Sequence, residues 1–267
     1  MKFLKIGGVV FGALVITTLG ISASDIFSGN SGSLLGQLVG TVQEGGCPTG
    51  MIAVVTSQTF SCVDTYEASA NDECPIEVPS HTGQTQDNLN NIDCRAVSKE
   101  GQKPWTFIAR EQAQVACMRA GKRLPTSAEW YAVALGTPDT EVCNIAGNGV
   151  TVTNSSPECR SAVGVYGAIG NVWEWTSDDV IDGMYQGRAL PDAGYVKQVA
   201  SDGIATVTGA TTSEQFSSDY FLSAQSGAYG VLRGGFFGSG DDAGVYAVQA
   251  KTVPTAATVA IGFRCIL

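Results

Sequence analysis

The stretch Gly170-Asn171-Val172-Trp173-Glu174-Trp175 carries most of the information about the fold of this chain. Trp173 and Trp175 alternate around Glu174. This alternation predicts two large apolar anchors with one polar contact between them. The hexapeptide is therefore expected to lie in the core, where its carboxylate needs a partner.

Two arginines lie beside apolar runs nearer the end of the chain, Arg233 and Arg264. We expect their guanidinium groups to hydrogen-bond carboxylates or backbone carbonyls beside the closing strands. Gly234 and Gly235 follow the first arginine, and glycine lets two backbone segments approach closely. These residues are predicted to be scaffold rather than catalytic machinery.

Two helices are expected before the hexapeptide. Residues 110–121 place small and apolar side chains on one helical face: Ala113, Ala116, Cys117 and Ala120. Gly121 supplies a C-terminal stop. A second helix begins with the capping box of Thr126 and Glu129 and continues to Leu135.

The rest of the chain is predicted to combine short strands with long loops. A hairpin and three closing strands are expected in β-type runs: Met51–Val55, Thr59–Tyr66, Val231–Arg233, Gly244–Gln249 and Ile261–Ile266. Residues 70–103 are expected to form a polar loop held by a disulfide, and His81 within it is expected to be solvated. Residues 137–165 are expected to be irregular, and residues 179–228 a long insertion with little regular structure.

Composition excludes several functions. Charged residues make up 15% of the 267 residues, against about 25% in ordinary soluble domains. The net charge is −10, which excludes a basic nucleic-acid interface and adhesion to anionic lipid. His81 is the one histidine, so a multi-histidine metal centre cannot form.

The N-terminus predicts export. Lys2 and Lys5 precede an apolar run, and the small residues Ser22, Ala23 and Ser24 end it. This order is typical of a secretory signal peptide, predicted over residues 1–24. A retained membrane anchor is the alternative, and any contact with a membrane would be through this segment. Gly/Ser-rich residues 25–46 are predicted to be a flexible tether, and both readings place the remainder outside the cytoplasm.

The cysteines agree with export. Eight cysteines allow 105 pairings, and an even number in an exported chain predicts disulfides. No C-x-x-C pair is present. The spacing favours three short loops and leaves Cys117 for Cys265: Cys47–Cys62, Cys74–Cys94, Cys143–Cys159 and Cys117–Cys265.

Ordered motifs suggest a family. They are residues 116–130 (ACMRAGKRLPTSAEW), the hexapeptide at 170–175, Leu232-Arg233-Gly234-Gly235 and Ile261-Gly262-Phe263-Arg264-Cys265. This series resembles the formylglycine-generating-enzyme (sulfatase-modifying factor) family, and Cys-Val-Asp-Thr-Tyr-Glu at 62–67 looks like its early strand. The resemblance covers residues 47–267 and implies an α+β, C-type lectin-like fold. That fold has short antiparallel strands, two main helices and many loops.

The same resemblance argues against catalysis. Family members that oxidise a substrate cysteine carry a cysteine pair after Arg-Gly-Gly, and its thiolates bind copper. The matching positions here fall near Ser239 and Gly244, and neither residue can be a thiolate. Other branches hold iron through histidines, for which His81 alone is insufficient. We therefore predict a non-catalytic member.

Calcium is the one cofactor that the resemblance leaves open, as a structural ion. Family members often bind Ca²⁺ near Gly-Asn-x-Trp-Glu-Trp. By resemblance the ligands would be the backbone carbonyls of Gly170 and Val172 and the side chain of Glu174. An Asn or Asp usually stands three residues before the motif's glycine, but here that residue is Gly167. The site would therefore lack one of the oxygen ligands that Ca²⁺ prefers.

Residues 236–260 are bounded by Arg-Gly-Gly and Ile-Gly-Phe-Arg. This arrangement is similar to the variable region of diversity-generating-retroelement target proteins, whose final strands and loops bind ligands. The segment is rich in Ser, Gly, Asp, Ala, Thr and aromatic residues, as such regions are. By this resemblance the candidate ligand-binding residues are Phe236, Phe237, Ser239, Asp241, Asp242, Tyr246, Gln249, Lys251, Thr252, Thr255, Ala256 and Thr258.

The sequence therefore predicts a secreted or surface-displayed protein that binds a protein or glycan through residues 236–260. Plain structural closure of the fold is an alternative role for that segment, and core packing is one for its aromatic residues. Two alternatives for the whole chain belong to other classes. One is a formylglycine-generating-type oxidase with an atypical site, and the other is a structural subunit of a pilus or surface layer.

Overall fold

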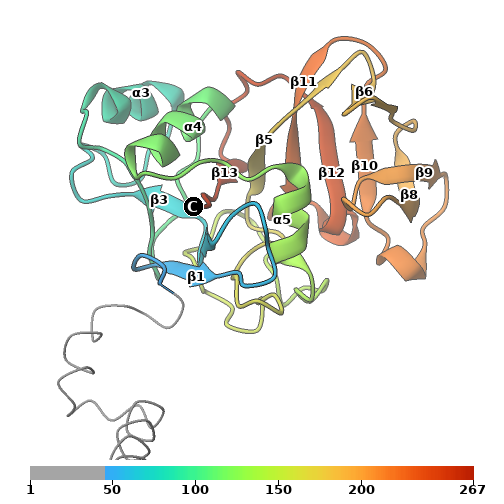
Figure 1. Cartoon of the computed structure of the whole chain (residues 1–267), viewed down its shortest axis with the longest axis horizontal. Helices are drawn as coiled ribbons and strands as arrows, with labels where there is room; N and C mark the ends of the chain where they lie inside the picture. Colours follow the sequence, from blue (N-terminus) through green and yellow to red (C-terminus); the bar gives the residue numbers. More distant parts are fainter. Residues whose placement is uncertain (1–45) are drawn as a thin grey trace, which may run out of the picture. The chain divides into compact units, whose positions relative to one another are not determined.

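The computed structural model describes residues 46–267 (Figure 1). The expected signal peptide or anchor, residues 1–24, and the tether up to residue 45 lie outside the described residues. Residues Thr49–Leu267 form one compact unit. Among the described residues, no helix has the length and apolar character needed to cross a bilayer.

A nine-stranded sheet runs through this unit, in the order β7-β6-β5-β11-β12-β10-β8-β9, with β13 on β5. Strand β10 is parallel to β12, β13 is parallel to β5, and the other pairs are antiparallel. The bounds are β5 (Trp173–Ile181), β6 (Met184–Tyr185), β7 (Arg188–Ala189), β8 (Gly194–Val199), β9 (Ala205–Gly209), β10 (Tyr220–Ser223), β11 (Ala228–Gly234), β12 (Gly244–Thr252) and β13 (Ile261–Phe263). The 3-10 turns η1 (Glu214–Phe216) and η2 (Gly240–Asp242) precede β10 and β12.

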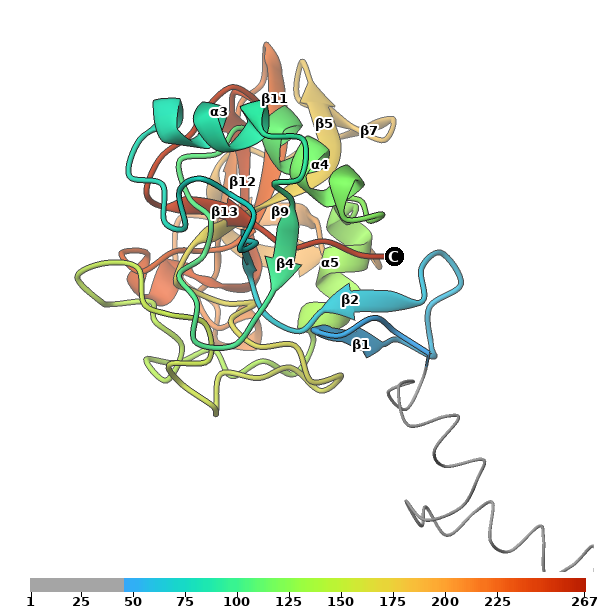
Figure 2. The same ribbon diagram turned by 90° about the vertical axis from the view of Figure 1, so that its left-hand side faces the viewer.

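The remaining elements precede the sheet in the chain. Strands β1 (Met51–Ala53) and β2 (Cys62–Asp64) form the expected hairpin, and β3 (Ala68–Ala70) pairs with β4 (Ala96–Ser98). The helices are α3 (Thr82–Asn90), α4 (Arg110–Arg119) and α5 (Ser127–Ala134). In Figure 2 the C-terminus lies beside β2, where the Ser61 and Cys62 N–H groups donate to the Leu267 carbonyl.

The predicted helices and closing strands are confirmed, and so is the α+β, loop-rich class. Helix α4 buries Ala113, Ala116 and Cys117. The capping box of α5 is formed, because the Glu129 N–H donates to Thr126 Oγ1 and the Thr126 N–H donates to Glu129 Oε2. Local signals were sufficient for these elements.

Two expectations of irregular structure are wrong. Residues 179–228 contain five complete strands, β6 to β10. Several of these strands are short, and only one face of this part of the sheet is covered. Apolar residues are therefore widely spaced in the sequence, and the two-residue periodicity of a strand is weak. Residues 70–103 contain α3 and β4. Helix α3 buries Thr85 and Asn88 beside Leu89, so it lacks an apolar stripe; His81, at its N-cap, is exposed as expected.

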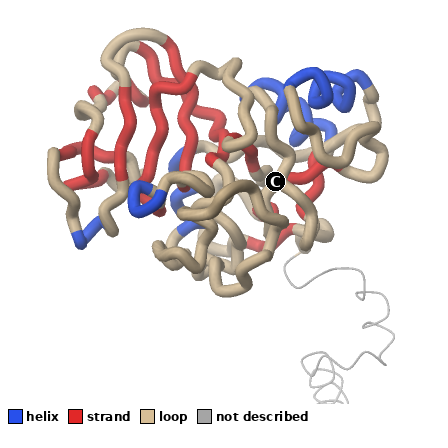
Figure 3. The backbone as a smooth tube through the Cα atoms, turned by 180° about the vertical axis from the view of Figure 1, so that it is seen from behind, coloured by secondary structure: helices blue, strands red, loops and turns tan. Residues whose placement is uncertain are grey.

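The sheet has two unlike faces. Val248 of β12 lies in one buried cluster with Phe221 and Val196. Its neighbour Ala247 lies in the cluster that contains Trp175 and Leu232. Because side chains alternate along a strand, the second face of β8, β10 and β12 also carries Tyr195, Tyr220, Leu222 and Gln249. We call it the open face, since no long helix among the described elements lies over this half of the sheet (Figure 3).

The expected disulfides are present. Cys74 bonds Cys94, Cys143 bonds Cys159, and Cys117 of α4 bonds Cys265 just after β13. Cys47 and Cys62 are disulfide-bonded as well, which leaves them to pair with each other, and no described cysteine is free. Four disulfides are typical of an oxidising, extracellular compartment.

Candidate functional site

The hexapeptide lies in a buried ionic centre. Glu174 and Arg264 are both fully buried. Arg264 Nη2 donates to Glu174 Oε1 at 2.5 Å, and Arg264 Nε donates to Glu174 Oε2 at 2.6 Å. Trp130 Nε1 donates to Glu174 Oε2 at 2.7 Å. The guanidinium also donates to the carbonyls of Asp64 and Tyr166, as the sequence predicts, so this centre is structural.

The same contacts bear on calcium. A calcium ligand must present a free oxygen lone pair. Glu174 Oε2 accepts two hydrogen bonds, from Arg264 and Trp130, and Oε1 accepts one from Arg264, which also brings a positive charge. In this arrangement the Arg264 guanidinium would compete with Ca²⁺ for the Glu174 carboxylate. The calcium site stays a prediction to which this geometry gives no support.

A second buried carboxyl group lies close by. Glu67 is 2% exposed, and its Oε1 accepts a hydrogen bond from Asn171 Nδ2 at 2.8 Å. Burial, with the charge of Glu174, raises the pKa of Glu67 from 4.5 to about 8. Glu67 is therefore neutral near pH 7, and sequence reasoning missed it because its neighbours are far away in the chain.

Replacing Glu67 with glutamine is expected to remove a pH-dependent loss of stability. Because the folded pKa is raised, the native state retains a proton that the unfolded state releases. This stabilising contribution is complete below pH 4.5 and is lost as the pH rises to about 8. Urea denaturation from about pH 5 to about pH 9 should show the decline in the native chain and a flatter profile in Glu67→Gln. Glu77→Gln, at an exposed position, should keep the native slope; an unchanged slope in Glu67→Gln would contradict the assignment.

Arg233 also lies in the core. It is fully buried, with its guanidinium 5.1 Å from the Trp130 ring centroid. Its Nη1 donates to the Gly203 carbonyl at 3.3 Å, which agrees with the predicted carbonyl contact. Burial lowers the pKa of Arg233 to about 10. The side chain thus joins α5 to the loop between β8 and β9.

The candidate ligand-binding residues of 236–260 do not share one surface. Tyr246 packs on the covered face, with ring centroids 5.1 Å from Phe216 and 5.8 Å from Tyr131. Phe236 and Phe237 contact each other at 5.1 Å between centroids. Phe236 packs against the buried cluster of the open-face side, as does Ala256. The phenylalanines therefore lie apart from Tyr246.

Two members of the set lie on the open face. Gln249 and Lys251 alternate with buried residues of β12, so they lie on that face. Gln249 Oε1 is buried and lacks a hydrogen-bond partner within the described chain. The remaining members are exposed or half-buried, in η2, at the end of β12 and in the loops around it: Ser239, Asp241, Asp242, Thr252, Thr255 and Thr258. Burial and the charge of Asp241 raise the pKa of Asp242.

Sequence reasoning missed the neighbours of Gln249. Leu222 of β10 pairs with Gln249 across the parallel register, and Tyr220 lies two residues before it on the same face. The alternation of Tyr220, Phe221 and Leu222 was the available signal, but it covers too few residues to stand out from the polar stretch around it.

Comparison with known proteins now adds the family. The sequence profile described as "Sulfatase-modifying factor enzyme 1-like domain" matches residues 51–267. The chain is 30% identical over 157 residues to the serine/threonine-protein kinase Pkn1 of Chlamydia trachomatis, a match that covers 54% of this chain and 21% of the kinase.

Solved structures of similar shape have low sequence identity. The Major Tropism Determinant U1 variant has a TM-score of 0.48 and 18% identity, covering 82% of this chain and 52% of its own. Treponema denticola variable protein 1 has a TM-score of 0.42 and 17% identity, over 82% and 99%. PvdO from Pseudomonas aeruginosa has a TM-score of 0.42 and 15% identity, over 81% and 90%.

The chain spans about half of the tropism determinant and about a fifth of the kinase. The family profile, by contrast, covers most of this chain, from β1 to the C-terminus. The resemblance and the C-type lectin-like fold that the motifs predict are therefore confirmed: the protein belongs to the sulfatase-modifying factor enzyme 1-like domain family.

Proposed function

We propose that this protein is a non-catalytic recognition domain that binds a protein or glycan through the open face and the adjoining residues of 236–260. One observation carries the proposal. The open face holds Gln249 and the exposed Lys251. Phe236, which contacts Phe237, packs against the buried cluster on the same side of the sheet. A rigid strand with an exposed polar side chain, on the same side of the sheet as partly exposed aromatic rings, is suited to ligand contact.

The chemistry of the chain supports a non-catalytic role. Ser239 and Gly244 stand where family oxidases carry their cysteine pair. All described cysteines are disulfide-bonded, so none of them is available as a thiolate. The buried carboxylate of Glu174 is paired with Arg264 and has no access to a substrate.

The architecture also supports a binding segment that can vary. Arg233 and Ile261 are buried on either side of it, whereas Asp241, Thr255 and Thr258 between them are exposed. Substitution at the exposed positions would leave the core contacts intact. We propose that the segment is displayed at a surface by the N-terminal residues 1–46 and is a target of retroelement diversification.

An array of glycans and extracellular protein domains, probed with the full chain, tests the proposal. Any ligand found should bind about tenfold more weakly to the double variant Gln249→Ala/Lys251→Ala, because truncation removes its polar contacts. Lys99→Ala is the matched control, since Lys99 is exposed and follows β4, which pairs with β3 in a separate sheet from β12. Ligands that bind the double variant as tightly as the native chain would contradict the proposal.

A further inference from the structure

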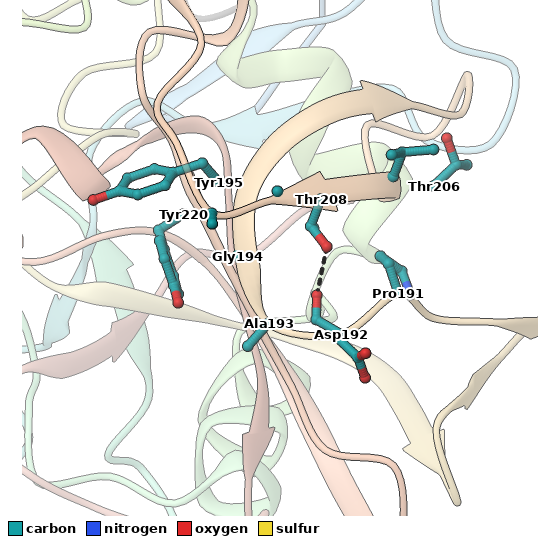
Figure 4. Close-up of a pocket in the computed structure, with 11 residues that line it drawn as sticks. Pro191, Asp192, Ala193, Gly194, Tyr195, Thr206, Thr208 and Tyr220 are labelled. Atoms are coloured by element: carbon teal, nitrogen blue, oxygen red, sulfur yellow. Dashed lines mark hydrogen bonds between the residues drawn. The ribbon is translucent and has the colours of Figure 1, made fainter.

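A separate pocket lies at the far edge of the sheet, between β8, β9 and β10 (Figure 4). Its volume is about 660 Å³, within the range of small-ligand sites. The lining residues come from segments 191–195 and 206–210 together with Tyr220. None of them belongs to residues 236–260, so the pocket is distinct from the candidate ligand-binding segment.

Two tyrosines form the aromatic wall. The rings of Tyr195 and Tyr220 are 5.0 Å apart between centroids and nearly perpendicular, at 87°. In this arrangement the edge of one ring contacts the face of the other, which holds both rings in place. The pair therefore offers one fixed ring surface for stacking. A cation cage would instead require several ring faces directed at the same point. Both tyrosines are half-buried, so part of each ring is accessible.

The rest of the lining is polar and almost uncharged. Asp192 is the one charged residue among the described residues that line the pocket. Figure 4 shows its carboxylate directed away from the two rings. Thr208 Oγ1 donates to the Asp192 carbonyl at 2.7 Å, and Gly194 and Gly209 contribute backbone to the lining. No cation is present in this lining to hold an anionic ligand.

We propose that this pocket binds a neutral sugar unit of a glycan. A hexose ring has an apolar C–H face that stacks on a tyrosine ring and a rim of hydroxyl groups. The threonine hydroxyls and backbone carbonyls of the pocket are matched to that rim. Tyr195 and Tyr220 also lie on the open face, so the proposal deepens the proposed function at this edge of the sheet. No residue of 236–260 lines the pocket, so a glycoside that binds Gln249→Ala/Lys251→Ala normally but not Tyr220→Ala separates the two.

Saturation-transfer NMR of the full chain with methyl glycosides of glucose, galactose, mannose and N-acetylglucosamine tests the proposal. At least one glycoside should receive saturation from the native chain. Tyr220→Ala should weaken its binding about tenfold or more, because the stacking surface is lost. Tyr229→Ala is the matched control, since Tyr229 is a half-buried tyrosine of β11 outside the pocket.

A blocking variant keeps the test valid if Tyr220→Ala fails to fold. Ala193 is exposed and lines the pocket, so Ala193→Trp should fill it without disturbing the core. Loss of the signal in this variant, with retention in Tyr229→Ala, supports the sugar site. The proposal is overturned if no glycoside receives saturation, or if Ala193→Trp binds as the native chain does. Binding of tetramethylammonium but of no glycoside would also overturn it, in favour of a cation site.

Discussion

Replacing Arg264 with alanine is expected to lower the free energy of unfolding by about 3–5 kcal/mol. The substitution leaves the Glu174 carboxylate fully buried without its cationic partner, and the Trp130 indole becomes its remaining side-chain donor. An uncompensated buried charge is among the most destabilising defects that a single substitution can produce. Urea denaturation at neutral pH measures the difference directly.

Two further variants separate the ion pair from general effects. The double variant Glu174→Gln/Arg264→Met should recover much of the loss, because neither charge then remains buried alone. Lys99→Ala should change stability by less than about 0.5 kcal/mol, since its contact with Asp72 is 3.8 Å long and exposed. If Arg264→Ala were as mild as Lys99→Ala, the ionic centre would not be the structural anchor inferred here.

Removing the Cys117–Cys265 disulfide by replacing both cysteines with alanine is expected to cost about 4–5 kcal/mol. The bond spans 148 residues of sequence, and on a chain-entropy argument the stabilisation grows with the length of the closed loop. It also ties α4 to the end of the chain, so the terminal residues that pair with β2 depend on it. Thermal and urea unfolding under non-reducing conditions provide the measurement.

The Cys143–Cys159 bond is a matched control. Its cysteines are buried to a similar degree, but it spans 16 residues of sequence. Its removal should therefore cost about 3 kcal/mol. The order of the two losses is the test: a larger loss for the shorter loop would show that local packing, rather than chain entropy, sets the contribution of these bonds.

Local signals explain which elements were predictable. Helix α5 could be located because Thr126 and Glu129 lie within one turn of each other and form a capping box. Helix α4 could be located from small residues at helical spacing. Helix α3 could not be located, because it packs through polar residues and has no apolar stripe. The side-chain amide of Asn88 exchanges two hydrogen bonds with the backbone of Ile76: its oxygen accepts from the N–H, and its nitrogen donates to the C=O. These two hydrogen bonds join residues 12 positions apart and form only in the folded chain.

The buried ionic centre and the candidate ligand-binding residues also combine features that the sequence indicated with features that it did not. The sequence indicated that Glu174 and Arg264 need polar partners, and the structure brings these two residues together across 90 positions. It did not indicate that Glu67 is buried or that it pairs with Asn171, 104 positions away. The sequence also grouped Tyr246 with Gln249, although odd and even residues of β12 face opposite sides of the sheet.

By itself, then, the sequence indicated the family, two helices and the closing strands, and it predicted a cysteine pairing that the structure confirmed. Each of these rests on motifs or spacings readable along the chain. Only the tertiary structure decided which face of β12 is open, which carboxyl group holds a proton, and that residues 191–220 form strands around a pocket. The physical reason is that burial and strand pairing arise between segments far apart in the chain, where local patterns carry no information about contact.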